Sequence, residues 1–117
     1  MAKQMSYTDD KGNFYPQAYF RPVQINMGIA DKSAYVVFYG YKDAAARQAG
    51  KALCVQKIYS ISNEKYADYF SPIALDTLNP IKQSYKLCIE IKDVESGQLD
   101  VNGKPIMKSF FEGSIDV

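Results

Sequence analysis

Apolar and polar positions alternate most regularly between residues 18 and 42. Residues 19, 21, 23, 25 and 27 are mainly apolar, and the intervening residues 20–26 are mixed. A period of two is typical of a half-buried strand. After the polar break at residues 31–33, the run 34–42 is dense in β-branched and aromatic residues, which favour strands. The pattern predicts a long β-hairpin around which the rest of the chain is organised, with Val23, Ile25, Val36 and Phe38 in the core.

Shorter patterns follow this hairpin. Residues 43–50 begin with an aspartate, continue with alanines and end with a glycine, which predicts one or two helical turns. Alternation over residues 53–61 predicts a third strand. Residues 64–70 predict a helix with Tyr66, Tyr69 and Phe70 on its sheet-facing side, and Ser71-Pro72 restarts a helix that runs to residue 78.

Residues 80–92 fit two structures. Alternating apolar residues from Ile81 to Ile91 match a strand, whereas Ile81, Tyr85, Cys88 and Lys92 trace one side of a helix. Because Asn79-Pro80 is a good helix start, we expect a helix over residues 80–86 and leave the remainder open.

Both ends of the chain predict additional structure. Residues 1–17 resemble an N-terminal arm or a lead-in hairpin, with turn-forming residues between two aromatic pairs. Asn102-Gly103, within residues 99–107, predicts another hairpin with a type I′ turn. The closing segment 109–117 contains Phe110 and Phe111, so we expect a docked tail, packed either on the chain's own core or on a neighbouring subunit.

These elements predict one α+β domain over residues 1–117. Its centre would be an antiparallel sheet, either open or closed in a barrel-like or sandwich-like form, with one or two short helices packed on it.

The amino-acid composition excludes most kinds of catalytic site. The chain has no histidine, which excludes Ser-His and Cys-His sites and nearly every zinc site. We therefore expect no catalytic, metal-binding or cofactor-binding residues, and no cofactor. An enzyme built on carboxylates such as Glu64, Asp68 and Asp76 is the remaining enzymatic alternative, but such residues more often cap and solvate helices.

The two cysteines, Cys54 and Cys88, are expected to be reduced and buried thiols. A disulfide requires that the fold bring them together, which sequence does not decide.

Charge is unevenly distributed, although the net charge is only +1. Residues 1–57 hold eight basic and four acidic side chains, a net +4, and residues 58–117 hold six basic and nine acidic, a net −3. Such a division would steer copies together head to tail. The sequence has neither an apolar run of the roughly 20 residues that span a bilayer nor a signal-peptide pattern, so we expect no membrane partner.

Tyrosine is the one residue type in surplus, with ten copies beside six phenylalanines and no tryptophan. Tyr35, Tyr39 and Tyr41 fall on one face of the predicted strand. They could be cross-strand core pairs, a protein interface or a platform for stacking nucleic-acid bases. Only two arginines accompany them, which argues against nucleic acid as a partner. We assign Tyr35, Tyr39, Tyr41, Phe110 and Phe111 as candidate interface residues.

Several short motifs carry a resemblance to a known class of proteins. They are Tyr7-Thr8-Asp9, Gly12-Asn13-Phe14-Tyr15, Ala18-Tyr19, Arg21, Asn79-Pro80-Ile81 and the closing run from Phe110 to Val117. In these motifs the chain resembles the small virion-associated proteins encoded among the head and tail genes of tailed bacteriophages. The resemblance implies a structural role in a particle, with no cofactor or catalytic residues, after synthesis in the cytoplasm of a bacterial host.

The leading functional hypothesis is therefore a non-enzymatic structural or assembly protein of a phage virion, which binds copies of itself and other virion proteins. The first alternative is a small bacterial module that binds a ligand or a partner. The second is a single-stranded nucleic-acid-binding protein.

Overall fold

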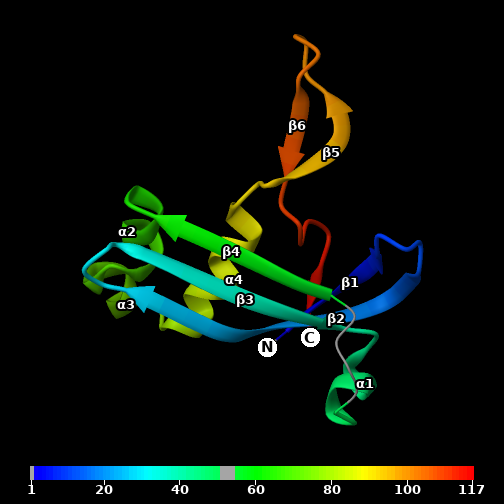
Figure 1. Ribbon diagram of the computed structural model, residues 1–117, viewed down its shortest axis with the longest axis horizontal. Coiled ribbons are helices and arrows are strands. Elements are labelled where there is room, and N and C mark those ends of the chain that lie inside the picture. The colour runs from blue at the N-terminus through cyan, green and yellow to red at the C-terminus, as the bar shows by residue number, and fades with distance from the viewer. Residues whose placement is uncertain (1, 51–54) are drawn as a thin grey trace.

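The computed structural model describes residues 2–50 and 55–117, and it confirms the α+β prediction. An antiparallel sheet in the order β4-β3-β2-β1-β7 forms the body, and a separate hairpin pairs β5 with β6 (Figure 1). The sheet does not close into a barrel within the described residues. Its strands are β1 (Lys3–Thr8), β2 (Phe14–Gly28), β3 (Ser33–Tyr41), β4 (Val55–Ser62) and β7 (Ile115–Asp116). The hairpin strands are β5 (Val94–Leu99) and β6 (Pro105–Lys108).

Helices α2 (Glu64–Phe70) and α4 (Pro80–Glu90) pack on the sheet, and α3 (Pro72–Thr77) packs on α2. The short helix α1 (Ala44–Gln48) lies at the other end of the sheet, beside β2 and β3 (Figure 1). Strand β4 confirms the predicted third strand from residue 55 onward. The predicted positions 53 and 54 lie outside the described residues.

A β-bulge in β2 decides which side chains enter the core. Pro22 pairs with Phe38 and Gln24 pairs with Val37, so Val23 is an extra residue with no opposite partner. The extra residue reverses the alternation, since Phe20 faces the core before it and Ile25 packs against the core after it. Val36 and Phe38 are fully buried as predicted, whereas the core prediction for Val23 is wrong, because its side chain is 43% exposed.

The β1–β2 turn is built around one aspartate and one glycine. Asp9 Oδ1 accepts hydrogen bonds from the backbone N–H of Lys11 (3.0 Å) and of Asn13 (2.8 Å), and Gly12 adopts a φ of +84°. This turn joins β1 to β2, so the first residues form the lead-in hairpin rather than a loose arm.

The β5–β6 turn repeats the same arrangement. Asp100 Oδ1 accepts from the N–H of Asn102 (2.8 Å) and of Lys104 (3.0 Å), and Gly103 adopts a φ of +78°. The predicted hairpin is therefore confirmed, but the predicted type I′ turn is wrong. That turn needs positive φ at both central positions, and Asn102 does not adopt it.

Three helix starts follow the predicted capping chemistry. The side chains of Asp43, Ser71 and Asn79 accept hydrogen bonds from backbone N–H groups three residues later, at 2.7, 3.3 and 2.9 Å. Asn63, which precedes α2, makes no such bond and adopts an unusual φ of 53° with ψ of −117°.

Residues 80–90 are helical, so the strand alternative is wrong over this range. The buried side of α4 holds Gln83, Ser84, Tyr85, Leu87 and Cys88. The predicted buried side of the helix is shifted by about one position from the observed one, because it included Ile81, whose side chain is 58% exposed. Two polar residues could take buried positions since each finds a carbonyl: Gln83 Nε2 donates to Ala74 O (2.8 Å), and Ser84 Oγ donates to Pro80 O (2.8 Å).

The C-terminal segment closes the molecule beside its N-terminus. Ala2 and Val117 exchange two backbone hydrogen bonds of 3.0 Å, and Lys3 Nζ forms an ion pair with Asp116 Oδ1 at 2.6 Å. The tail is thus docked, as predicted for residues 109–117. Because β7 pairs with β1, the two ends of the chain lie together at one edge of the sheet (Figure 1).

Candidate interaction surfaces

The expected interface tyrosines lie in one row on the sheet face opposite α2 and α4. Tyr35, Tyr39 and Tyr41 alternate along β3, where Tyr35 is 37% exposed and the other two are half-buried. Tyr41 pairs across the sheet with Tyr19, and Tyr39 pairs with Arg21. The structure therefore brings the three predicted residues together with a fourth tyrosine and one cation. An interface role for this tyrosine row stays a prediction.

Phe110 and Phe111 pack on the chain's own core, one of the two dockings expected for the tail. Residues 110–113 form turns, and both rings join one aromatic cluster. The centroid of Phe111 lies 5.1 Å from that of Phe38 and 5.2 Å from that of Phe20. Phe111 is fully buried and Phe110 packs against the same core. Their interface role stays a prediction.

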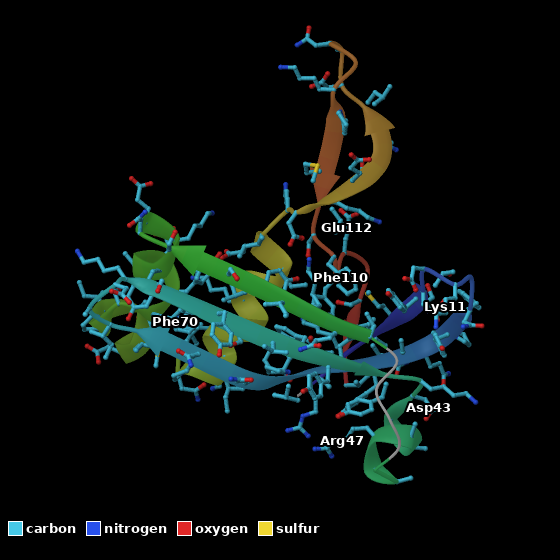
Figure 2. All side chains as sticks on the ribbon, in the orientation of Figure 1. Lys11, Asp43, Arg47, Phe70, Phe110 and Glu112 are labelled. Atoms are coloured by element: carbon cyan, nitrogen blue, oxygen red, sulfur yellow. The ribbon has the colours of Figure 1, made fainter. Side chains whose placement is uncertain are left out.

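A projecting hairpin, residues 94–108, is the most exposed part of the molecule. It stands away from the sheet, and its tip projects clear of the other described elements (Figures 1 and 2). Residues 97–107 are all exposed. Its exposed apolar side chains are Leu99 (65%), Val101 (101%), Ile106 (41%) and Met107 (40%). The sequence did not single out this surface, although apolar residues around a predicted turn were a visible signal.

The base of the projecting hairpin is firmly held. Where the chain enters it, Asp93 Oδ2 pairs with Lys57 Nζ at 2.7 Å, and this ammonium group also lies 5.3 Å from the centre of the Phe110 ring. Where the chain leaves it, the Ser109 hydroxyl is buried and donates to the carbonyl of Cys88 at 2.6 Å. The fold therefore presents a free tip from a fixed base (Figure 2).

A groove of about 550 Å³ lies between the edge of β2 and the first turns of α4. We call it the β2-edge groove, and its lining is Arg21, Pro22, Val23, Gln24, Ile25, Asn79, Ile81, Lys82 and Tyr85. Two of these residues are cationic and none is acidic. Among the described residues, no strand pairs with this side of β2 over residues 21–28.

The buried thiol is not a reactive one. Burial raises the pKa of Cys88 to about 12, so the group is a neutral thiol at physiological pH, and it donates to the Tyr85 carbonyl at 3.1 Å. Cys54 lies outside the described residues, so the question of a disulfide stays open.

The carboxylates that the sequence offered as enzymatic candidates do not form a site. Glu64, Asp68 and Asp76 are exposed on α2 and α3. Within residues 2–50 and 55–117, no three His, Cys, Asp or Glu side chains gather where they could hold a metal ion. In the same part of the chain, no helix is both long and apolar enough to cross a membrane.

Comparison with known proteins adds no further information. No protein family, no curated protein and no solved structure matches this chain.

Proposed function

We propose that this chain is a non-enzymatic structural or assembly protein, a component of a bacteriophage virion, which binds neighbouring subunits through its projecting hairpin. The observation that carries the proposal is the set of exposed apolar side chains on residues 94–108, held out from a fixed base. An isolated two-stranded hairpin is marginally stable in water, and exposed apolar side chains add solvation cost. A partner that covers both faces of the hairpin would remove this cost.

The two faces of the hairpin divide its apolar residues between them. Leu99 pairs with Pro105 and Glu95 pairs with Met107, which places Leu99, Pro105 and Met107 on one face, and Ile106 lies on the other. A partner that touched a single face would leave the other in water. Insertion of the hairpin between two subunits, or into a cleft of one, covers both.

The edges of the hairpin favour contact through its faces. Pro105 lacks an N–H group, and Gly97, with a φ of +85°, lies at an irregularity in the β5–β6 register. Proline and bulges are devices that protect edges from pairing with other strands. The proposed contact is therefore made by apolar side chains and not by an added strand.

Excision of the hairpin tests this proposal. Val94 and Lys108 are cross-strand neighbours, so a short glycine-serine linker can replace residues 94–108 without moving Asp93 or Ser109. We expect the full chain to form a concentration-dependent oligomer in light-scattering chromatography, and the excised variant to be a folded monomer. A full chain that stays monomeric at every concentration, or an excised variant that oligomerises unchanged, contradicts the proposal.

Point variants refine the test. Val101→Ser should weaken association by about fivefold or more, because truncating an interface anchor costs over about 1 kcal/mol. Ile73→Ser is the matched control, since Ile73 is 82% exposed on α3 and lies outside the hairpin. Equal effects of the two variants would show that general surface hydrophobicity, rather than the hairpin, drives association.

One observation favours the nucleic-acid alternative. The tyrosine row lies on an open sheet face with Arg21 opposite Tyr39, and aromatic rings on a sheet with nearby cations can stack bases. Because the row includes a single cation, we expect weak and strongly salt-dependent binding to single-stranded DNA. Submicromolar binding at physiological salt, lost in Tyr39→Ala, would favour this alternative over assembly.

A further inference from the structure

The free edge of β2 is a second surface, separate from the projecting hairpin. The first residue of β1, Lys3, pairs with Phe20, and β2 continues beyond this pair to Gly28. Over residues 21–28 the only strand paired with β2 in the described structure is therefore β3, on its other side. This edge is about 27 Å long at 3.4 Å per residue. Its unpaired backbone groups are a template for another strand.

Pro22 and the β-bulge at Val23 interrupt the start of this edge. Beyond them, residues 24–28 contain no proline, no bulge and no charged side chain. Val23 and Met27 are partly exposed along this edge, at 43% and 36%. The free edge of β4 differs, because Lys57 points inward from it and forms the ion pair with Asp93. Inward-pointing charges protect edges, so β4 is protected at Lys57, whereas residues 24–28 of β2 carry no such device.

Helix α4 turns this edge into a groove. Asn79, Ile81, Lys82 and Tyr85 form the helical wall of the β2-edge groove, and residues 21–25 form the strand wall. A groove between an edge strand and a helix is the geometry in which peptides bind by strand addition, where backbone bonds supply affinity and side-chain pockets supply specificity. Ile25 and Ile81 offer apolar contact, and Arg21 and Lys82 offer positive charge without an opposing carboxylate in the lining.

We propose that the β2-edge groove binds an extended, carboxylate-bearing segment of a partner protein, which pairs with β2 residues 21–28 as an added strand. Charge selects the occupant: the groove carries two cations and no acid, so an acidic segment with apolar residues at alternate positions complements it. A second copy of this chain is a poorer occupant. Its β5 is interrupted at Gly97, and its β6 begins with Pro105 and is flanked by Lys104 and Lys108, which the groove cations repel.

A synthetic peptide tests this directly. The probe is an acetylated eight-residue peptide that alternates valine with glutamate and threonine, titrated into the ¹⁵N-labelled full chain. We expect micromolar to submillimolar binding, with amide shifts concentrated in residues 21–28 and the first turns of α4. The same peptide with lysine in place of glutamate should bind at least about fivefold more weakly, since it exchanges attractive charge pairs with Arg21 and Lys82 for repulsive ones.

Backbone pairing and charge are tested by matched variants. Two further peptides carry N-methyl groups on alternate amides, one set for each edge of the extended peptide, and at least one of them should lose binding. Lys82→Glu should weaken binding by about fivefold, whereas Lys65→Glu, an equally charged change at an exposed position of α2, should not. Excision of residues 94–108 should leave peptide binding unchanged, which separates this proposal from the role of the hairpin.

Several outcomes would overturn the proposal. They are no binding up to millimolar peptide, shifts that map away from the groove, or full binding by both N-methylated peptides. Shifts of the groove amides with protein concentration alone, without peptide, would also overturn it, because they would identify a second copy as the occupant.

Discussion

The ring of Phe20 occupies the space above Gly40, its cross-strand neighbour on β3. A Cβ atom placed on Gly40 would lie 2.5 Å from Phe20 Cε1 and 2.5 Å from Val55 Cγ1, far inside van der Waals contact. A fully buried Phe20 in turn contacts Phe111, which closes the core from the C-terminal side. Glycine is therefore required at position 40 for packing, and its conformational freedom is not involved.

Gly40→Ala should destabilise the fold by about 1–3 kcal/mol, because the ring of Phe20 must shift within a filled core. Gly28→Ala is the control: its Cβ would lie 3.2 Å from Ser33 Oγ, a side chain that can rotate, so a change below about 1 kcal/mol is expected. Urea denaturation measures both. Equal costs at the two positions would contradict the packing argument.

Phe38→Ala should cost about 3–5 kcal/mol, because it leaves a cavity at the centre of the aromatic cluster. Val23→Ala should cost less than about 1 kcal/mol, since the bulge places this side chain at the exposed groove. The pair tests the bulge directly by chemical denaturation. If Val23→Ala cost as much as Phe38→Ala, Val23 would be a core residue, as the uninterrupted alternation in the sequence predicted.

Asn63→Gly should stabilise the protein by about 1 kcal/mol, because a φ of 53° with a ψ of −117° is a strained backbone for any residue with a Cβ atom. The side chain makes no capping hydrogen bond that would be lost. Asn79→Gly is the opposite case, since Asn79 caps α4 at ordinary backbone angles, and it should destabilise by a few tenths of a kcal/mol. Urea denaturation should show changes of opposite sign in the free energy of unfolding for the two variants. A destabilised Asn63→Gly protein would show that the backbone at Asn63 is not strained.

Stability should fall as pH rises above about 9, partly through Cys88. The folded state holds the pKa of this thiol at about 12, whereas an exposed thiol titrates near 9. Between these values the unfolded state loses the proton and the folded state keeps it, so stability is lost with increasing pH at up to about 1.4 kcal/mol per pH unit.

Cys88→Ser isolates this contribution, because the hydroxyl can still donate to the Tyr85 carbonyl but does not titrate in this range. The difference between the urea midpoints at about pH 8 and about pH 10 should be smaller for the variant than for the natural sequence. An identical pH dependence in both proteins would mean that the thiol ionises as readily folded as unfolded.

Local interactions explain what could be predicted from the amino-acid sequence. Asp43, Ser71 and Asn79 stand at the predicted helix starts, and each accepts a hydrogen bond from an N–H three residues away. Such bonds depend only on neighbouring residues, so their effect is readable in a short stretch of sequence. The central hairpin and the helical character of residues 80–86 followed from similarly local patterns.

The surroundings of the candidate interface residues depend on both local and distant parts of the chain. The tyrosines of β3 share an open face, since strand alternation is a local property. The sequence left open whether the tail packs on its own core or on another subunit, and Phe111 fills the core between Phe20 and Phe38, more than 70 positions away in the chain. Nothing local to residues 109–117 indicates that neighbour.

The sequence by itself determined the period-two strands, the turns at Asp9 and Asp100, and the capped helices, because hydrogen bonds over a few residues and side-chain alternation specify them. Only the tertiary structure decided the bulge at Val23 and the isolation of residues 94–108 from the body. Each of these depends on which strands meet and where their pairing stops. That is a balance among contacts distant in sequence, which no short stretch of sequence contains.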